Sequence, residues 1–229
     1  MKNKYFKIGK KYIGDGKKVF IIAEIGINHG GDFKKCMKMI NVAVKSGADS
    51  VKIQTNDVDE SYMQNTDSYK EFKYKNFSNK ELLKLRKYSE SLGAIFFSSP
   101  GDIKSLMRLI KIKVPVIKIS SGLATNLPLI GEVVKRKIPT IISTGFLTKK
   151  DLDNLKKFIN KFNFRKIAVL KCTSIYPASS SNLDLNSINF LKEKFNLPIG
   201  YSDHTIGDLA AVIAVSCGAT IIEKHFTLN

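Results

Sequence analysis

The three histidines of this 229-residue chain, His29, His204 and His225, each lie at the end of a short apolar run. Carboxylates and hydroxyls accompany them, as in the strings Ser-Asp-His and Glu-Lys-His that end the last two runs. Two imidazoles with nearby carboxylates and water suit Mn, Fe, Co or Zn better than Mg or Ca. If the last two runs are adjacent strands, His204 and His225 can converge on one divalent ion.

Two lysines, Lys52 and Lys118, lie inside apolar runs, where an ammonium is costly to bury unless an anion meets it. Hydroxyl groups end several of the same runs and, with the lysines, form a predicted cradle for a phosphate and a carboxylate. The hydroxyls in this prediction belong to Ser99, Ser121, Ser143 and Ser202. The pattern fits a metal-assisted reaction of a phosphorylated acid with a carbonyl compound. An aldolase that forms a Schiff base on Lys52 or Lys118 fits it equally.

The elements that would position these residues alternate regularly along the chain. Eight β-branched, almost wholly apolar runs predict parallel strands buried on both faces: Val19–Gly26, Ser50–Thr55, Ala94–Ser99, Val116–Ser121, Thr140–Gly145, Ile167–Thr173, Pro198–His204 and Ala219–Thr227. Between them, apolar residues at helical spacing predict seven helices: Phe33–Ser46, Asn79–Leu92, Asp102–Ile110, Leu127–Lys135, Lys149–Asn163, Asp184–Phe195 and Ile206–Cys217.

Strict β-α alternation with eight strands predicts an α/β fold, a (β/α)8 TIM barrel, in which chemistry takes place at the C-terminal ends of the strands. Residues 1–18 are expected to form an N-terminal hairpin with its turn at Gly14, Asp15 and Gly16, and residues 19–229 to form the barrel domain. No eighth helix follows the last predicted strand. We therefore expect either a chain truncated after strand 8 or a neighbouring subunit, as in a homodimer, that covers this strand.

Charge and composition narrow the class of protein. The 38 Lys and Arg residues against 20 Asp and Glu give a net charge of +18, but they are spread along the chain, which argues against a nucleic-acid face. The three cysteines are odd in number and lack CxxC spacing, which argues against both a disulfide framework and a zinc ribbon. No signal peptide is evident, and no stretch approaches the ~20 apolar residues of a membrane span. We expect a cytoplasmic protein with no membrane and no nucleic-acid partner.

A set of motifs, in this order and at this spacing, closely resembles the sialic acid synthase family. The resemblance runs from about Val19 to Asn229 and is carried by the strings AEIGINHGGD, ADSVKIQT, FFSSP, KISSG, STG, CTSIYP, GYSDHTIG and EKHFT. The family's fold is a (β/α)8 barrel. Its members condense phosphoenolpyruvate with an N-acylated hexosamine such as N-acetylmannosamine, which implies a transferase of the N-acetylneuraminate synthase type in surface carbohydrate biosynthesis, for capsule or lipopolysaccharide.

The resemblance also implies roles for individual residues. His204 and His225 would bind manganese or another divalent metal. Glu24, Lys52, Lys118 and His225 would be catalytic. The residues that would bind phosphoenolpyruvate or the sugar are Gln54, Ser99, Ser121, Ser143, Ser174, Tyr176, Ser202 and Asp203.

Departures from the family pattern concern the water-activating group and the C-terminal domain. KISSG is followed by Leu123, where the family usually has a carboxylate that could activate water, and Ser99 and Ser174 stand where Thr and Asn are common. Family members usually continue with an eighth helix and a small antifreeze-like domain, which carries an arginine that grips the sugar's acyl group. The motifs AEIGINHGGD and KISSG favour the sialic and legionaminic branches over the pseudaminic one. A truncated, non-catalytic basic binding protein is the alternative.

The long segment Asn56–Asn79, which is rich in Asp, Asn, Ser and Tyr, separates the second strand from the following helix. A loop of this length is either a lid over the site or a surface insertion.

Overall fold

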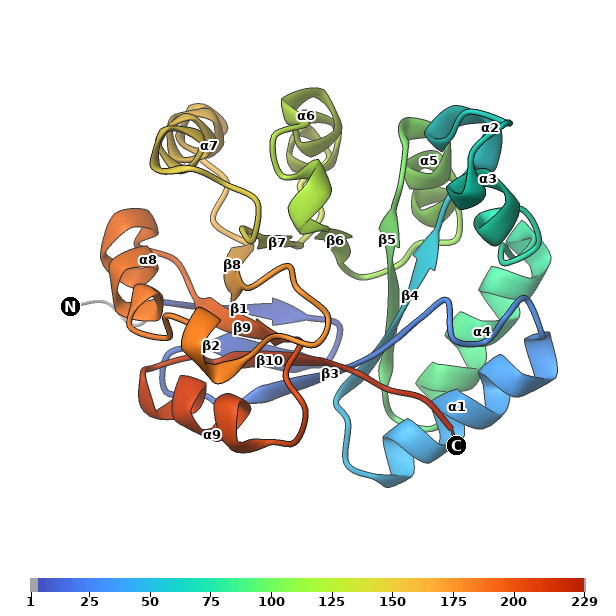
Figure 1. Ribbon diagram of the computed structural model, residues 1–229, viewed down its shortest axis with the longest axis horizontal. Helices are drawn as coiled ribbons and strands as arrows, with labels where there is room; N and C mark the ends of the chain where they lie inside the picture. The colour runs from blue at the N-terminus through green and yellow to red at the C-terminus, as the bar shows by residue number, and fades with distance from the viewer. Residues whose placement is uncertain (1–3, 229) are drawn as a thin grey trace. The chain divides into compact units, whose positions relative to one another are not determined.

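Eight strands hydrogen-bond in a closed order in the computed structural model, which describes residues 4–228, and this confirms the predicted α/β barrel (Figure 1). The order is β10-β3-β4-β5-β6-β7-β8-β9. The strands are β3 (Phe20–Gly26), β4 (Ser50–Thr55), β5 (Ile95–Pro100), β6 (Ile117–Ile119), β7 (Thr140–Ser143), β8 (Ile167–Cys172), β9 (Ile199–Asp203) and β10 (Ile221–His225). Nearly every strand residue is buried, because both faces of each strand are covered.

The seven predicted helices all form, most with boundaries within one or two residues of those expected. They are α1 (Phe33–Lys45), α4 (Asn79–Ser91), α5 (Ile103–Lys111), α6 (Leu127–Lys135), α7 (Lys149–Lys161), α8 (Ser187–Phe195) and α9 (Leu209–Ser216). The segment expected as a lid or an insertion contains two further short helices, α2 (Val58–Ser61) and α3 (Asp67–Phe72). Two 3-10 turns, η1 (Ser121–Leu123) and η2 (Ser180–Asn182), follow β6 and β8.

Side-chain caps account for where several helices begin. Asp32 accepts a hydrogen bond from Lys35 N at the start of α1, and Ser78 and Thr148 form capping boxes at the starts of α4 and α7. Helix α8 begins three residues later than predicted, because η2 and a turn at Asp184 come first. Across residues 4–228, none of the helices combines the length and apolar character needed to cross a membrane.

The N-terminal hairpin forms, but its predicted turn is wrong. Strands β1 (Tyr5–Ile8) and β2 (Lys11–Gly14) pair antiparallel, so the turn lies between Ile8 and Lys11, whereas Gly14 ends β2. This register places Phe6, Ile8 and Ile13 on one buried face. Burial of those side chains, and not the glycine content of the sequence, therefore selects the turn.

The contacts between residues divide the chain into two compact units. Unit 1 combines Met1–Ile21 with Lys118–Lys224, and unit 2 combines Ile22–Ile117 with His225–Asn229.

In unit 1, β8 pairs in parallel with β7 and β9, and β9 pairs with β10. Helix α8 packs against β8 and β9, and α9 packs against β9. Because side chains alternate along a strand, Ser202 and its register partner Glu223 share one face, and Tyr201 lies on the other, helix-covered face.

In unit 2, β4 pairs in parallel with β3 and β5, and α4 and α5 pack against β5. His29, which follows β3, is fully buried, with its ring centroid 4.5 Å from that of Phe77. Its Nδ1 accepts a hydrogen bond from Gly31 N at 3.0 Å. Burial, with the charges of Lys35 and Lys75, lowers the pKa of His29 to about 4, so this histidine is a neutral part of the core.

Candidate active site

A buried ion pair forms the first of three clusters of predicted site residues, and it lies in unit 1. Lys118 Nζ is 2.8 Å from Glu223 Oε1, and Ser202 Oγ donates to the same oxygen at 3.0 Å. Only 2–5% of each of these residues is exposed. The structure thus brings together Lys118 and Ser202, two of the predicted anion-binding residues, around one carboxylate, which we call the Lys118 cluster.

Hydroxyl groups at the ends of β6, β7 and β8 form the second cluster. Gly145 N donates to Ser121 Oγ at 3.0 Å. A Cβ at Gly145 would lie 2.3 Å from Ser174 Oγ and 3.0 Å from Ser121 Oγ, so both hydroxyls border this position and a side chain here would displace Ser174. Ser143 Oγ is buried and has no hydrogen-bond partner among residues 4–228. Ser121 and Ser174 thus border Gly145, and Ser143 ends β7 two residues before it. We call these three serines the hydroxyl cradle, in which the Ser143 hydroxyl needs an acceptor.

His204 lies beside the cradle residues and stacks on Tyr176. Their ring centroids are 3.9 Å apart, and Tyr176 OH lies 2.9 Å from His204 Nε2. His204 Nδ1 lies 2.7 Å from the carbonyl oxygen of Thr173, so this nitrogen carries the hydrogen and donates it. Nε2 is then the nitrogen that accepts from Tyr176.

Cys172 adds a thiol to the same neighbourhood, with Sγ 3.9 Å from both ring nitrogens of His204. Burial raises the pKa of the Cys172 thiol, but hydrogen bonds from His204 and Ser121 and the charge of Lys118 outweigh it, so the net shift is downward. Burial lowers the pKa of His204, yet the hydrogen bond and charge of Cys172 and the Thr173 carbonyl raise it above its ordinary value. Thiol and imidazole therefore stabilise each other's charged forms.

The predicted metal ion can be tested against these donors. An imidazole that donates Nδ1–H to a backbone carbonyl and presents Nε2 has the arrangement that metal-ligating histidines use. His204 therefore fits as a ligand. No group of three or more His, Cys, Asp or Glu side chains able to hold a metal occurs within residues 4–228. The joint site of His204 and His225 stays a prediction.

The third cluster lies in unit 2 around Lys52. Lys52 Nζ is 2.6 Å from Glu24 Oε2 and donates to Ser99 Oγ at 3.2 Å. Gln54 Nε2 donates to the other oxygen of Glu24 at 3.4 Å. Strands β3, β4 and β5 place these four predicted residues together because Glu24 pairs in register with Lys52, and Gln54 with Ser99. We call them the Lys52 cluster.

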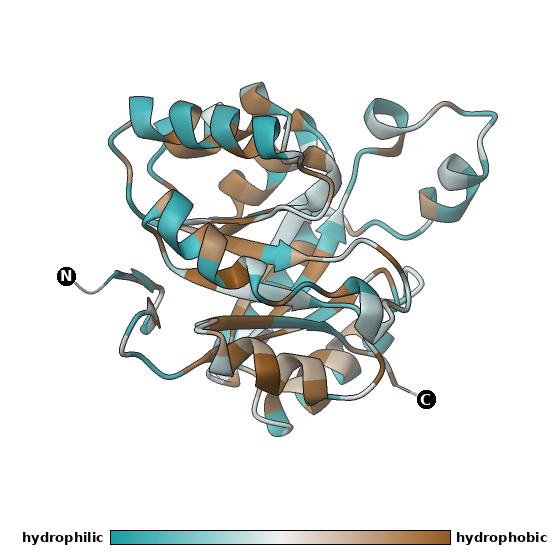
Figure 2. Ribbon diagram, turned by 60° about the vertical axis from the view of Figure 1, so that its left-hand side comes forward, coloured by the Kyte–Doolittle hydropathy of each residue, from teal (hydrophilic) through white to brown (hydrophobic). Residues whose placement is uncertain are grey.

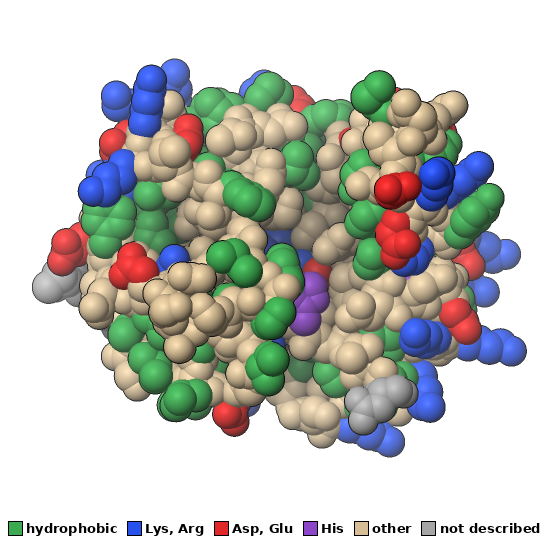
Figure 3. Space-filling view, in the orientation of Figure 1, with side chains coloured by type: hydrophobic (Ala, Val, Ile, Leu, Met, Phe, Trp, Pro, Cys, Tyr) green, Lys and Arg blue, Asp and Glu red, His purple; other side chains and the backbone are tan. Residues whose placement is uncertain are grey.

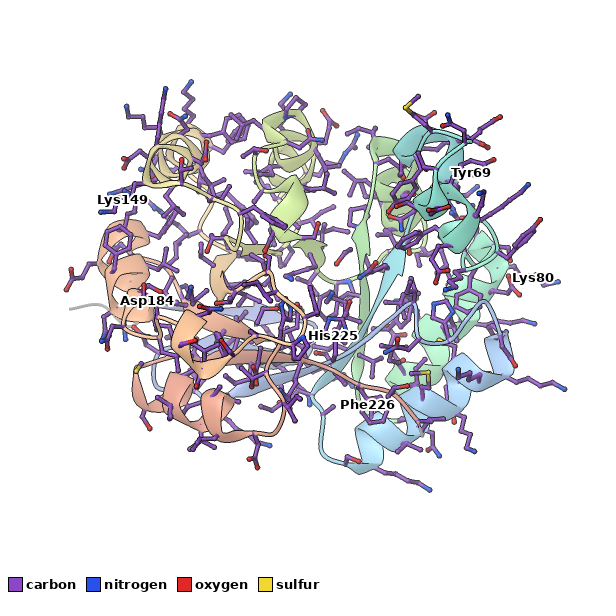
Figure 4. All side chains as sticks on the ribbon, viewed as in Figure 1. Tyr69, Lys80, Lys149, Asp184, His225 and Phe226 are labelled. Atoms are coloured by element: carbon purple, nitrogen blue, oxygen red, sulfur yellow. The ribbon has the colours of Figure 1, made fainter. Side chains whose placement is uncertain are left out.

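Asp203 and His225, two further predicted site residues, belong to none of the three clusters. Asp203 is buried on the helix-covered face of β9, where Oδ2 is 2.7 Å from Lys224 Nζ and Oδ1 accepts from Thr205 N. Its carboxylate holds the loop after β9, and a role toward a substrate stays a prediction. His225, the last residue of β10, is exposed and belongs to unit 2. Figure 4 labels it beside Phe226, whose N–H donates to the carbonyl of Glu24.

Glu223 and Cys172 are residues to which the sequence reasoning assigned no role. Glu223 accepts hydrogen bonds in the Lys118 cluster, and Cys172 contacts His204. The sequence did contain an indication for Glu223. This residue lies two positions before His225, and residues two apart on a strand share a face. For Cys172 the signal was weaker, since a single cysteine in an apolar strand is usually a packed core residue.

Comparison with known proteins places the chain in a family. The model of the NeuB family matches residues 39–229. The chain is 36% identical to the N,N'-diacetyllegionaminic acid synthase of Legionella pneumophila, over 96% of this chain and 67% of the relative. It is 37% identical to the pseudaminic acid synthase of Campylobacter jejuni, over 93% of this chain and 66% of the relative.

A solved structure is also similar over nearly the whole chain. The N-acetylneuraminic acid synthetase of Leptospira borgpetersenii, solved with citrate, superposes with a TM-score of 0.95 at 33% identity, covering 99% of this chain and 79% of that one. This chain spans about two thirds of the length of the curated relatives it matches. Family model, relatives and structure agree with the motifs, and the chain belongs to the NeuB family, the sialic acid synthase family.

Proposed function

We propose that this protein condenses phosphoenolpyruvate with an N-acylated hexosamine to give a nonulosonic acid and phosphate, for carbohydrate biosynthesis in the cytoplasm. The observations that carry the proposal are the hydroxyl cradle of Ser121, Ser143 and Ser174 and the buried Lys118, whose charge acts on Cys172 as the Ser121 hydroxyl does. Hydroxyl and ammonium donors together suit the phosphate and carboxylate of one small, highly charged acid. The names of the relatives, which are synthases of legionaminic and pseudaminic acid, support the same class of product.

Each cluster has a role in this reaction. The hydroxyl cradle and the Lys118 cluster would hold and orient the anionic groups of phosphoenolpyruvate, and Lys52 with Ser99 would supply further donors to an anion. Glu24 and Gln54 would accept and donate hydrogen bonds to the sugar, as would Tyr176. His204 and His225 would hold manganese or another divalent ion, which when bound supplies Lewis-acid polarisation of the aldehyde.

The bonds that change follow from the substrates. C3 of phosphoenolpyruvate attacks the open-chain aldehyde carbon, the aldehyde oxygen takes up a proton, and water adds at C2. The C2–O bond to phosphate then breaks, which leaves a 2-keto acid and inorganic phosphate. Leu123, in the 3-10 turn η1, has no group that can accept the proton of this water. Unlike Leu123, the two lysine clusters do contain buried carboxylates. Glu24 is paired with Lys52, and Glu223 is paired with Lys118.

The ion pairs of both lysines argue against the Schiff-base alternative. Lys52 Nζ and Lys118 Nζ each lie within 2.8 Å of a buried carboxylate oxygen, which favours the charged ammonium. A Schiff base requires the neutral amine. Treatment with borohydride and a carbonyl substrate should therefore leave both lysines unmodified, and a trapped adduct on either would support the aldolase instead.

Release of phosphate from phosphoenolpyruvate tests the proposed function. Release should require an N-acyl sugar and manganese and should stop with EDTA. N-acetylmannosamine and the N-acyl sugars of the legionaminic and pseudaminic branches would be compared. The chain is 36% identical to a legionaminic acid synthase and 37% identical to a pseudaminic acid synthase, so sequence identity does not favour either branch. Absence of release with every sugar and metal would contradict the proposal. Steep, salt-sensitive nucleic-acid binding would instead favour a basic binding protein.

His204 is the residue whose substitution should affect this reaction most. We expect His204→Ala to abolish metal-dependent phosphate release, because the ring supplies both the Nε2 atom that would bind the metal and the stacking partner of Tyr176. Manganese binding, followed by electron paramagnetic resonance, should weaken in parallel. Tyr176→Phe is the matched control, since it removes only the hydroxyl and should retain manganese binding. Unchanged turnover in His204→Ala would remove this histidine from the metal site.

The predicted homodimer belongs to the same proposal. Helix α9 exposes several large apolar side chains, with Ile206 just before it 86% exposed, Leu209 69% and Val212 60%. Figure 2 shows α9 as a mainly brown, apolar helix, and Figure 3 shows green side chains gathered over it. Sedimentation equilibrium of the whole protein measures whether it is a dimer.

A further inference from the structure

A cavity of about 490 Å³ opens in unit 1 between the first turns of α7 and α8. It is large enough for a small organic molecule. Figure 4 labels two residues at its mouth, Lys149 in the first turn of α7 and Asp184 just before α8. Its lining includes four large apolar side chains, those of Leu147, Leu152, Phe190 and Leu191.

The cavity also contains a lysine in an unusual position. Lys171 is a residue of β8 and pairs in register with Tyr201, whereas its neighbour Cys172 pairs with Ser202. Lys171 therefore lies on the helix-covered face of the strand, where apolar side chains are expected, and opposite to the face of the Lys118 cluster. It is only partly exposed.

The ammonium of Lys171 has no carboxylate partner among the described residues 4–228. In the described residues 4–228, no carboxylate lies within 4.0 Å of Lys171 Nζ or of Lys149 Nζ. The contact that Lys171 Nζ makes is a long hydrogen bond of 3.4 Å to the carbonyl of Cys172. A partly buried ammonium gains most from an anion that reaches it, and two lysines against the single carboxylate of Asp184 leave the cavity net positive.

We propose that this cavity is a second binding site, for a small organic anion that carries an apolar ring or chain. The negative group would lie at Lys171 and Lys149, and the apolar part against Leu152 and Phe190. The site is distinct from the proposed phosphoenolpyruvate site, because its lysine lies on the opposite strand face. The two share a wall, since Gly145 and Cys172 line the cavity, while Gly145 N donates to Ser121 and Cys172 contacts His204.

Titration with phenyl phosphate tests the site, because this probe combines an anion with a ring. Binding would be followed by calorimetry and by the methyl NMR signals of Leu147, Leu152 and Leu191. We expect one saturable site, shifts in these methyl signals, and persistence of binding with phosphoenolpyruvate in excess. Inorganic phosphate and benzyl alcohol should each bind about tenfold more weakly or worse, since each lacks one half of the recognition.

Substitutions of lysines identify the contact. Lys171→Met should weaken phenyl phosphate binding about tenfold or more, Lys171→Arg should retain it, and Lys161→Met at the far end of α7 should leave it unchanged. Thermal melts would establish that each variant is folded. Displacement by phosphoenolpyruvate, equal binding by Lys171→Met, or equal loss in the folded Met and Arg variants would overturn the proposal. None of these outcomes depends on whether the chain turns over phosphoenolpyruvate.

Discussion

The Lys52 cluster and the Lys118 cluster both neutralise a buried lysine, but their hydrogen bonds are arranged differently. Each places a lysine in a buried parallel strand and neutralises it with a glutamate from another strand. In the Lys52 cluster the two oxygens of Glu24 accept from different donors, Lys52 and Gln54, on the adjacent strand β4. In the Lys118 cluster one oxygen of Glu223 accepts from both Lys118 and Ser202.

This difference indicates how each cluster should respond to change. Lys52 also donates to Ser99, so it keeps a neutral partner when its carboxylate is altered. Glu223 Oε1 accepts from Lys118, which lies 105 positions away in the sequence, and from Ser202, so two buried donors meet at this one atom. We therefore expect the Lys118 cluster to depend more strongly on a single carboxylate than the Lys52 cluster does.

Glu223→Ala should have the largest effect on stability. The substitution removes the carboxylate that accepts from both Lys118 and Ser202, and breaking a buried ion pair typically costs about 3–5 kcal/mol of the free energy of unfolding. Urea denaturation followed by circular dichroism measures this change. Glu223→Gln is the control, because its amide oxygen can still accept from Lys118 and Ser202, and it should cost clearly less. A loss below about 1 kcal/mol for the alanine variant would show that Lys118 finds another partner.

Acidification should act on unit 2 through His29. Its pKa of about 4 in the folded protein lies below the ordinary value of about 6.5, so the unfolded chain binds this proton first as the pH falls. Stability should thus be lost from about pH 6.5 down to about pH 4, by about 2 kcal/mol at pH 5.

The measurement for His29 is urea unfolding at pH 7.5 and pH 5, compared with His29→Gln. The variant lacks the imidazole, so the part of the pH dependence that belongs to His29 should vanish. The same loss of stability between the two pH values in both proteins would assign it to other titratable groups.

Glu24→Gln should have a smaller effect, which sharpens the comparison. The amide oxygen can still face Lys52, and Gln54 can rotate its own amide to accept from the new NH2 group. With the Ser99 hydrogen bond kept, we expect a loss of about 1 kcal/mol. Urea unfolding of Glu24→Gln and Glu223→Gln under the same conditions gives the direct comparison, because both variants carry the same substitution. Equal losses in the two variants would mean that the clusters do not differ in the way that their geometry suggests.

The sequence predicted most of the fold because local signals agreed with one another. Apolar β-branched runs and capping residues such as Ser78 and Thr148 determine strands and helix starts from a few neighbouring residues. The hairpin turn was misplaced because Gly9 and Gly14 both suit a turn, and only the burial of Phe6 and Ile8 decides between them. Tertiary packing of this kind cannot be read from local residue types.

The sequence selects candidate site residues, but it does not predict how these residues pair. Strand ends and family motifs identified Lys52, Lys118 and His204, and the structure places each of them among polar partners. Which carboxylate neutralises which lysine depends on strand register, as does the placement of Asp203 with Lys224 on the helix-covered face. Register is a long-range property, so Glu223 remained without a role until the strands were paired.

Val212→Ser should have the smallest effect on stability and serves as a control for the other substitutions. Val212, on α9, is 60% exposed, so its side chain contributes little to packing. The free energy of unfolding should therefore change by no more than about 0.5 kcal/mol. Binding of an apolar fluorescent dye should nevertheless fall, because the variant interrupts the exposed apolar face that includes Leu209. Ala214→Ser, at a fully buried position of the same helix, is the matched comparison and should lower stability without lowering dye binding. A large loss of stability in Val212→Ser would instead mean that this face of α9 packs against another molecule in solution. The effects of Glu223→Ala and Glu24→Gln would then have to be compared in the associated form of the protein.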